Sequence, residues 1–238
     1  MYFWQLKKDG VIVKYMGNGS MKTAIITGAS DGLGLKISEK LLKNGWKIIG
    51  LSRNKPNIDI EYIKTDLSKE SDINNAINEI KRRYPIFHSL INCAGVMSVQ
   101  KMKNLDYSEI NNLFKINVLA PIKLISGLIE NIKTNEADIV NVGSTVGFKA
   151  YEDQCAYGSS KWALRGVTEN LQLELKGTKC RVIGFNPGGF KSKIFEKATG
   201  IKPNLDAFME PEHLADLLVY ILEMPKTLEV SQIIINRK

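Results

Sequence analysis

The sequence predicts an α/β fold: a single doubly wound domain with a mainly parallel, seven-stranded sheet and helices on both faces. Short runs of β-branched residues alternate with helical stretches from residue 21 onward. This alternation implies right-handed crossovers between parallel strands. The strand segments are apolar throughout, as expected for strands covered on both sides. A chain of 238 residues, 44% of them hydrophobic, has the size of one domain with a substantial core.

The expected elements follow in a regular order. A first strand over 22–27 leads through a glycine-rich turn into a helix over 32–43, which Asn44 and Gly45 end. Strands over 46–52 and 61–65 precede a helix over 71–84. The remaining strands are expected at 89–92, 137–142, 181–186 and 230–235, and the remaining helices at 107–132, 155–176 and 211–223.

Residues 1–20 precede this pattern and lack the apolar core of a signal peptide. They are compatible with an upstream translation start before Met21, with an extra hairpin or with a cloning remnant. We interpret residues 1–20 as a peripheral extension without chemistry, and residues 21–238 as the functional domain.

The composition gives little sign of a macromolecular partner. The formal net charge of +8 would suit an acidic partner, such as nucleic acid, an acyl carrier protein or a phosphorylated ligand. The lysines are scattered, however, so we expect solvated faces and no nucleic acid. No apolar run approaches the roughly 20 residues of a membrane span, so we expect no membrane partner. Three cysteines without a Cys-x-x-Cys pair and only two histidines predict a reducing, cytoplasmic setting and no metal site.

A glycine-rich turn, Thr27-Gly28-Ala-Ser-Asp-Gly32-Leu-Gly34, joins the first strand to the first helix. Glycines there permit a tight turn, close approach of a pyrophosphate and close packing of helix on strand. The helix N-terminus adds free N–H groups and partial positive charge. The spacing differs from Gly-x-Gly-x-x-Gly and lacks the Gly-Lys-Ser/Thr of nucleotide triphosphatases. The strand–turn–helix context indicates a dinucleotide site.

Tyr157 and Lys161 stand four residues apart in a predicted helix, so their side chains share one helical face. An ammonium beside a phenol favours the phenolate, and we therefore expect Lys161 to lower the pKa of Tyr157. Such a phenol can exchange a proton with a carbonyl or an alcohol. Ser144 ends an apolar run thirteen residues upstream. Each residue alone would be an ordinary surface or strand-end residue, and their joint occurrence favours a catalytic group.

Four landmarks occur in order: Thr27-Gly28-x-x-x-Gly32-x-Gly34, Asn92-Cys-Ala-Gly95, Ser144 and Tyr157-x-x-x-Lys161. Asn117 and Pro187-Gly188 complete the pattern. In these motifs the chain resembles the short-chain dehydrogenase/reductase family over residues 21–238. The resemblance implies a Rossmann-type fold, a nicotinamide dinucleotide across the carboxyl ends of the strands, and a homodimer or homotetramer.

The resemblance also implies the role of each catalytic residue. Tyr157 would be the general acid/base, and Lys161 would hold the ribose and lower the pKa of Tyr157. Ser144 would bind the substrate oxygen, and Asn117 would support a water that resupplies the proton. The reaction implied is hydride transfer between the nicotinamide and a small carbonyl compound or secondary alcohol. The alternative is a catalytically silent NAD(P)-binding regulatory or scaffold protein.

The predicted cofactor is NADP(H) in preference to NAD(H). Ser52 stands where an NAD site usually has an acid, and Arg53 suits a 2′-phosphate. Asp31 argues against this choice, because many phosphate-preferring relatives have a base there. Ser192 replaces the family's threonine beside the carboxamide, and Gly189 is expected to loosen that loop. The residues predicted to contact the cofactor are Gly28, Ser30, Asp31, Gly32, Leu33, Gly34, Ser52, Arg53, Asp66, Leu67, Asn92, Ala94, Gly95, Tyr157, Lys161, Pro187, Gly188 and Ser192.

Residues 191–210 correspond to the mobile substrate lid of the family. The segment combines lysines with Ile194, Phe195 and Phe208, which fits a partly apolar substrate with an anionic end or a plain amphipathic helix pair. Phe148, Tyr151, Glu152 and Gln154 lie between Ser144 and Tyr157 and are predicted pocket residues. Apolar residues of the helices that carry Asn117 and Tyr157 could mediate oligomerisation or face the sheet: Leu113, Ile116, Leu119, Ile122, Leu171 and Leu175. The sequence names no substrate.

Overall fold

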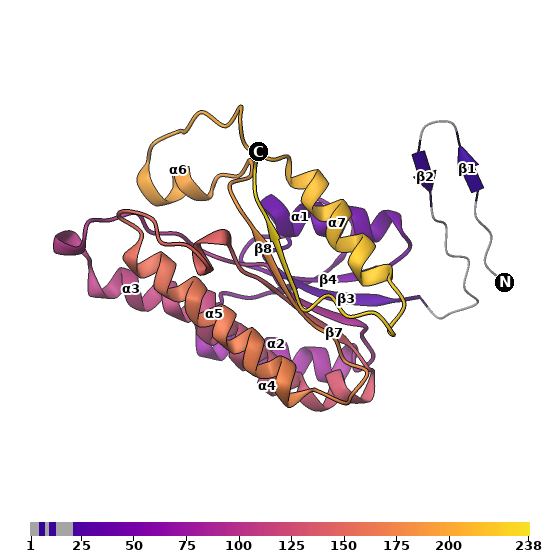
Figure 1. Ribbon diagram of the computed structural model, residues 1–238. Coiled ribbons are helices and arrows are strands. Elements are labelled where there is room, and N and C mark those ends of the chain that lie inside the picture. Colours follow the sequence, from indigo (N-terminus) through magenta and orange to yellow (C-terminus); the bar gives the residue numbers. More distant parts are fainter. Residues whose placement is uncertain (1–4, 8–9, 13–20) are drawn as a thin grey trace.

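A parallel sheet of seven strands forms the centre of the protein (Figure 1). The structure is a computed structural model, and the described residues are 5–7, 10–12 and 21–238. The strand order is β5 (Glu61–Lys64), β4 (Lys47–Ser52), β3 (Thr23–Thr27), β6 (Ser89–Asn92), β7 (Asp138–Val142), β8 (Val182–Pro187) and β9 (Gln232–Ile235). Every pair is parallel. The order reverses between β3 and β6, which creates the crevice where such sheets bind ligands. The predicted Rossmann-type fold is confirmed.

Helices cover both faces of this sheet (Figure 1). On one face lie α1 (Gly32–Lys43) and α7 (Pro211–Glu223), and on the other lie α2 (Glu70–Arg83), α4 (Ala120–Thr134) and α5 (Cys155–Glu174). Alternate residues of β3 serve the two layers: Ile25 packs with α2 and α4, whereas Ala24 and Ile26 pack with α1 and α7. The five inner strands are therefore buried on both sides, as predicted, whereas the edge strands β5 and β9 are partly exposed.

The long helix predicted over 107–132 is interrupted. It divides into α3 (Tyr107–Phe114), a π-helical turn (Lys115–Leu119, η2) and α4. Pro121 explains the interruption, because it has no N–H with which to bond the carbonyl of Asn117 four residues earlier. The N–H of Ala120 instead reaches Lys115 O in the wider register. The interruption thus falls on a predicted catalytic residue.

Short elements that the sequence analysis did not predict surround the carboxyl ends of the strands. They are two 3₁₀ turns, η1 (Met102–Asn104) and η3 (Thr145–Gly147), and the helix α6 (Ile194–Thr199) within the predicted lid. In residues 1–20, β1 (Gln5–Lys7) and β2 (Gly10–Ile12) pair antiparallel in a sheet of their own. This agrees with the extra-hairpin alternative, while the absence of chemistry there stays a prediction.

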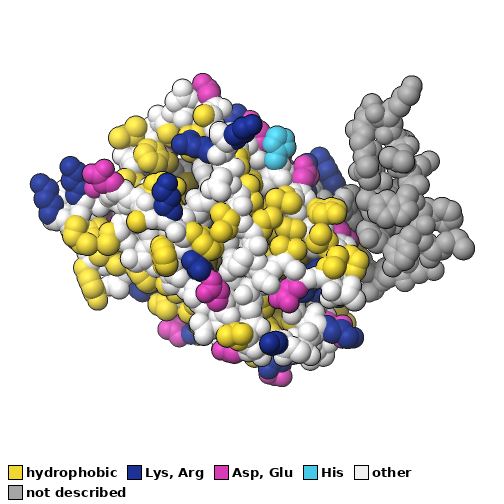
Figure 2. Space-filling view, viewed as in Figure 1, with side chains coloured by type: hydrophobic (Ala, Val, Ile, Leu, Met, Phe, Trp, Pro, Cys, Tyr) yellow, Lys and Arg dark blue, Asp and Glu magenta, His cyan; other side chains and the backbone are white. Residues whose placement is uncertain are grey.

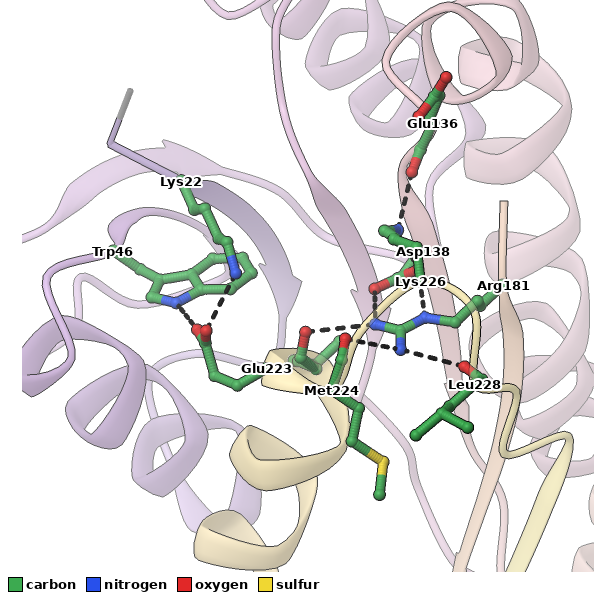
Figure 3. Close-up of polar contacts among 10 residues, drawn as sticks. Lys22, Trp46, Glu136, Asp138, Arg181, Glu223, Met224, Lys226 and Leu228 are labelled. Carbon is green, nitrogen blue, oxygen red and sulfur yellow. Dashed lines mark hydrogen bonds and ion pairs between the residues drawn. The ribbon is translucent and has the colours of Figure 1, made fainter. Parts of the chain in front are cut away.

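A buried ion pair fastens the amino ends of β7 and β8 to the end of α7 (Figure 3). The Arg181 guanidinium donates to both oxygens of Asp138, at 3.0 and 2.7 Å. It also donates to the carbonyls of Leu222, Met224 and Leu228. Lys226 adds a second cation to Asp138. This network lies at the end of the sheet opposite the crevice, so it serves the fold.

Glu223 makes a similar connection to the amino end of β3. It accepts from Trp46 Nε1 at 2.6 Å and from Lys22 Nζ at 3.0 Å (Figure 3).

Figure 2 shows lysine and arginine side chains spread among acidic and apolar ones on the face in view. That distribution agrees with the solvated, scattered lysines that the sequence indicates.

One helical segment meets the criteria for a membrane span by length and composition. Within the described part of the chain this is Tyr107–Thr134, with a mean hydropathy of 1.4 and half of its most apolar window buried in the protein. Leu124, Leu128 and Ile132 on this segment belong to the core against the sheet. The core helix of a globular protein passes the same test, so this finding is weak evidence for a membrane span. It differs from the expectation that no segment approaches the length and hydropathy of a span.

Candidate active site

The glycine turn has the geometry of an anion cradle. Gly28 and Gly32 have positive φ angles of 73° and 55°, which favour glycine. A Cβ on Gly34 would lie 2.4 Å from Gly28 O, so only glycine allows this close packing of helix on strand. A Cβ on Gly32 would enter open space, the side on which a phosphate can approach. The buried Leu33 and Gly34 begin α1, where backbone N–H groups lack intrahelical partners.

Asp31 caps α1 and also contacts the predicted lid. Its Oδ1 accepts from Gly32 N at 2.7 Å, and its Oδ2 accepts from Lys197 Nζ of α6 at 2.5 Å. Lys197, followed by the bond to Gly32, holds the pKa of Asp31 below its usual value despite partial burial. The negative charge that argued against a phosphate is therefore already paired. Ser30 beside it is half-buried.

The loop after β6 passes beside this turn. A Cβ on Gly28 would lie 3.0 Å from Ala94 Cα, so Gly28 lets the two segments touch. Asn92 is buried, and its Oδ1 accepts no hydrogen bond from the described residues. A buried unpaired carbonyl beside an open glycine cradle fits a hydroxyl-bearing nucleotide. The residues present therefore fit the predicted dinucleotide.

Two buried polar residues set the position of that loop: Thr27, which the sequence analysis named only as part of the glycine motif, and Asn141, which it did not name. Thr27 Oγ1 accepts from the N–H groups of Cys93 and Ala94, both at 3.0 Å. Asn141 in β7 accepts from Asn92 Nδ2 at 2.9 Å and donates to Thr168 Oγ1 at 3.0 Å. Asn141 had a visible signal, because it is a polar residue inside an otherwise apolar central strand.

Ser144, Tyr157 and Lys161 converge at the carboxyl end of β7, and all three are buried. Ser144 caps η3, accepting from Val146 N at 3.2 Å. A Cβ on Gly147 of the same turn would lie 3.0 Å from Lys161 O, so this glycine lets the serine turn lie against α5. Lys161 Nζ donates to Val142 O at 3.1 Å and lies 5.9 Å from the centre of the Tyr157 ring.

The electrostatics of this group differ from the expectation. Burial raises the pKa of Tyr157 to about 12, and the hydroxyl of Ser144 only partly opposes the rise. Burial also lowers the pKa of Lys161 to about 8. The expected lowering of the pKa of Tyr157 by Lys161 is not found in the protein alone, because burial dominates and the Lys161 ammonium is directed at the carbonyl of Val142.

Asn117 joins the loop after β6 to α5. Its Oδ1 accepts from Val96 N and its Nδ2 donates to Val96 O, both at 2.9 Å. Nδ2 also donates to Ser160 Oγ at 3.1 Å. A Cβ on Gly95 would lie 3.4 Å from Asn117 Oδ1 and 3.6 Å from Lys161 Nζ. The side chain of Asn117 is thus occupied in positioning, and the backbone carbonyl that Pro121 leaves without its helical partner is the group available to a water.

The end of β4 presents a free cation. Ser52 is buried and donates to Asn54 O at 2.8 Å, so its hydroxyl is partly engaged. Arg53 is exposed and makes no direct ion pair among the described residues, although its positive charge helps to lower the pKa of Asp66. Asp66 accepts from Ser68 N and Oγ, and although burial opposes it, these bonds help keep its pKa below the usual value. Leu67 is buried in the core.

The loop after β8 is held more firmly than predicted. Pro187 pairs with Ile235 in the sheet, and Gly188 N donates to Ile235 O at 2.7 Å. A Cβ on Gly189 would lie 2.7 Å from the Phe208 ring, which in turn lies 4.7 Å from the Arg237 guanidinium. The expectation that Gly189 loosens the loop is wrong, because this glycine admits an aromatic ring against the backbone.

The start of the predicted lid lies close to that loop. Ser192 Oγ accepts from Ile194 N at 3.5 Å, at the beginning of α6. Lys191 pairs with Glu210, and Lys197 pairs with Asp31. With two of its lysines paired, the lid gives less support to an anionic substrate end than its composition indicates. Within the described part of the chain, no cluster of three His, Cys, Asp or Glu residues could hold a metal ion.

Comparisons with known proteins agree with this geometry. The family model for short chain dehydrogenases matches residues 22–200. A farnesol dehydrogenase of Aedes aegypti is 25% identical over 235 residues, covering 90% of this chain and 95% of the relative. Carbonyl reductase family member 4 of Danio rerio is 28% identical over 218 residues, covering 86% and 92%.

Solved structures share the fold. An alcohol dehydrogenase of Thermococcus sibiricus in complex with 5-hydroxy-NADP superposes with a TM-score of 0.81 at 20% identity, covering 91% of this chain and 96% of the other. A 4-hydroxyisoleucine dehydrogenase in complex with NADH superposes with a TM-score of 0.80 at 22% identity, covering 91% and 97%. The two neighbours bind different nicotinamide cofactors. Sheet order, site geometry and family match point the same way, and the chain belongs to the short-chain dehydrogenase family.

Proposed function

We propose that this protein is an NADP(H)-dependent oxidoreductase that transfers a hydride between the nicotinamide and a carbonyl compound or secondary alcohol. The observation that carries the proposal is the buried group of Ser144, Tyr157 and Lys161 at the end of β7, one strand away from the loop beside the glycine turn. The cofactor supplies the hydride chemistry, and the protein binds, orients and protonates.

Each residue has a separate task. Ser144 binds the substrate oxygen and holds it beside Tyr157. The phenol of Tyr157, whose pKa burial raises to about 12, is protonated at neutral pH. Since an alkoxide is a far stronger base than this phenolate, Tyr157 can donate its proton as charge develops on the substrate oxygen. This state suits reduction of a carbonyl.

Lys161 and Asn117 support the tyrosine. We assign Lys161, buried with a pKa of about 8, to bind the ribose and to provide a positive charge near the phenol. Asn117 fixes the loop after β6 through Val96 and leaves its backbone carbonyl for a water that returns the proton. In this proposal Lys161 supplies the positive charge that acts on Tyr157, and the water held by Asn117 resupplies the proton that Tyr157 donates.

The preference for NADP(H) rests on Arg53. Its exposed guanidinium at the end of β4, without an acid partner among the described residues, suits a 2′-phosphate. Asp31, the residue that would oppose a phosphate, is paired with Lys197. We assign the other predicted contacts to the same cofactor site: Gly28, Ser30, Gly32, Leu33, Gly34, Ser52, Asp66, Leu67, Asn92, Ala94, Gly95, Pro187, Gly188 and Ser192.

The test of the chemistry is Tyr157→Phe. With NADPH and a panel of ketones, aldehydes and diketones, we expect the substitution to lower kcat by about 10²–10⁴-fold, the usual contribution of a general acid. Binding of NADPH, followed by fluorescence titration, should persist. Turnover that survives the substitution would contradict the role of Tyr157. Tight NADPH binding by the wild-type protein without turnover of any carbonyl would favour a silent nucleotide-binding protein.

Cofactor preference has its own test in Arg53→Ala. Loss of charge-assisted hydrogen bonds of about 1.5–3 kcal/mol should weaken NADPH binding by about 10–100-fold. NADH binding should change little. Lys55→Ala removes an exposed cation two residues away and serves as the matched control. Equal losses for both cofactors would contradict the 2′-phosphate assignment.

Three further properties belong to this proposal: residues 191–210 act as the substrate lid, the enzyme works in the cytoplasm, and it forms a homodimer or homotetramer. The three cysteines are free, which suits a reducing compartment. Leu119 at the end of η2, Ile122 near the start of α4 and Leu173 on α5 are exposed, whereas Leu113, Leu171 and Leu175 are buried. Light scattering after size-exclusion chromatography tests the assembly, and a monomer would contradict it.

A further inference from the structure

Two glutamine side chains near the active site each bury a carbonyl oxygen without a hydrogen-bond donor among the described residues. They are Gln100 and Gln154. The backbone N–H of Gln100 donates to Asp153 O at 2.7 Å, so the segments that carry the two glutamines meet. An unpaired buried carbonyl lowers stability, and native proteins keep few of them. Two at one junction require an explanation.

The orientation of Gln100 is defined by its neighbour. Gln100 Nε2 donates to Glu109 Oε2 of α3 at 2.5 Å. An ionised carboxylate only accepts hydrogen bonds, so the nitrogen must face Glu109 and the oxygen must face the other way. Gln100 therefore presents a true acceptor.

Gln154 stands on the catalytic face of α5. Positions 154, 157 and 161 are three and four residues apart, so Gln154, Tyr157 and Lys161 follow one another along one face. Gln154 is the N-cap residue of α5, yet its side chain makes no capping hydrogen bond. Glutamine is not a favoured N-cap residue. Asp153 before it has a positive φ of 56°, a strained backbone of the kind that occurs at functional sites.

An apolar cluster packs around Tyr157. Leu113, Val146 and Tyr157 pack together, and Val96, Met97 and Phe114 pack against them. Glu109 stands four residues before Leu113 on α3, so the two side chains share a face of that helix. The segments that surround Tyr157 with apolar groups thus also carry the two glutamines and Glu109, three or four residues away in the sequence.

We infer that Gln154, assisted by Gln100, forms the polar end of the substrate site and selects carbonyl compounds that carry a hydroxyl group away from the reacting oxygen. Gln154 precedes Tyr157 by three residues, about one helical turn, so the acceptor and the phenol come from neighbouring positions on one face of α5. The apolar cluster receives the carbon skeleton between them. Both acceptors are uncharged amides, so a neutral hydroxyl suits them better than an ammonium, whose burial would be costly. This inference rests on the proposed function.

The experiment compares 4-hydroxycyclohexanone with 4-methylcyclohexanone, which replaces the hydroxyl by a methyl group. We expect wild-type enzyme to prefer the hydroxyketone in kcat/KM by roughly tenfold, the value of about one good hydrogen bond. Gln154→Met, which keeps the length of the side chain but removes the acceptor, should abolish this preference. Gln154→Glu keeps an acceptor at the same place and should retain the preference.

A second readout needs no turnover. Because Gln154→Met removes an unpaired buried carbonyl, it should raise the Tm of the free protein by roughly 2–4 °C. A lower Tm would make Gln154 a structural residue and overturn the inference. A wild-type enzyme that reduces neither ketone, or shows the same ratio as Gln154→Met, would also overturn it. In each case Tyr157-dependent reduction of other carbonyls would leave the proposed function intact.

Discussion

Lys161 is a buried cation, and we expect its removal to stabilise the free protein while it disables the enzyme. Burial lowers the pKa of Lys161 from 10.5 to about 8. At pH 7 both the folded and the unfolded chain carry this proton, and the difference in pKa corresponds to about 3 kcal/mol against folding. Lys161→Met also loses the hydrogen bond from Nζ to Val142 O, worth about 1 kcal/mol. The net gain in unfolding free energy is then about 2 kcal/mol at pH 7.

The gain should vanish at alkaline pH. Between about pH 8 and pH 10.5 the unfolded chain holds a proton that the folded protein has lost, so the stability of the wild type rises with pH. At pH 9.5 the penalty has fallen to about 1 kcal/mol, which the lost hydrogen bond of Lys161→Met offsets. We therefore expect Lys161→Met to melt about 4–8 °C above the wild type at pH 7 and at nearly the same temperature at pH 9.5.

The assay is thermal unfolding of both proteins without nucleotide at the two pH values. Tyr157→Phe is the matched control, because the pKa of Tyr157 is raised from 10.0 to about 12 and its phenol changes charge little below pH 9.5 in either state. A difference in Tm between wild type and Lys161→Met that is the same at both pH values would refute the reasoning. A lower Tm for Lys161→Met at pH 7 would refute it as well.

Three other substitutions test separate parts of the structure. Arg181→Ala should lower the unfolding free energy by about 3–5 kcal/mol in urea titrations, because it leaves Asp138 buried with one exposed cation; a loss below about 1 kcal/mol would contradict the role of the pair. Gly34→Ala should weaken NADPH binding more than about tenfold in fluorescence titrations, since its Cβ would lie 2.4 Å from Gly28 O. Unchanged binding would mean that the glycine turn can shift to accommodate the added methyl group. Lys197→Ala should raise the pKa of Asp31, followed by NMR titration, and an unchanged pKa would mean that the pair does not persist in solution.

Regular elements were largely predictable from the sequence because their signals are local. The helix over 32–43 ends where Asn44 and Gly45 end it, and the strand at 89–92 matches its predicted bounds. The π-helical turn at Lys115–Leu119 was not predicted, although Pro121 was visible. A proline near a helix start is compatible with both a new helix and a kink, and packing around Asn117 decides between them.

The grouping of Ser144, Tyr157 and Lys161 could be predicted because the motifs fix their spacing, but the pKa values of these residues could not. The pKa of Tyr157 depends on how much protein surrounds the phenol, and no local pattern reveals burial. Gly189 was misjudged for the same reason, because Phe208, nineteen residues later, fills the space beside it. Contacts between distant segments, such as Asp31 with Lys197, leave no periodicity in the sequence.

The edge strand β9 also supports the loop after β8. Ile235 of this strand accepts the hydrogen bond from Gly188 N, and Arg237, two residues after the strand, packs on the Phe208 ring that lies against Gly189. Proteolytic clipping after Ser231 would therefore remove the prop of a loop that lies far upstream in the chain. Such a truncated enzyme should remain folded around β3 and β6 yet handle its substrates poorly, and affinity tags are better placed at the other terminus.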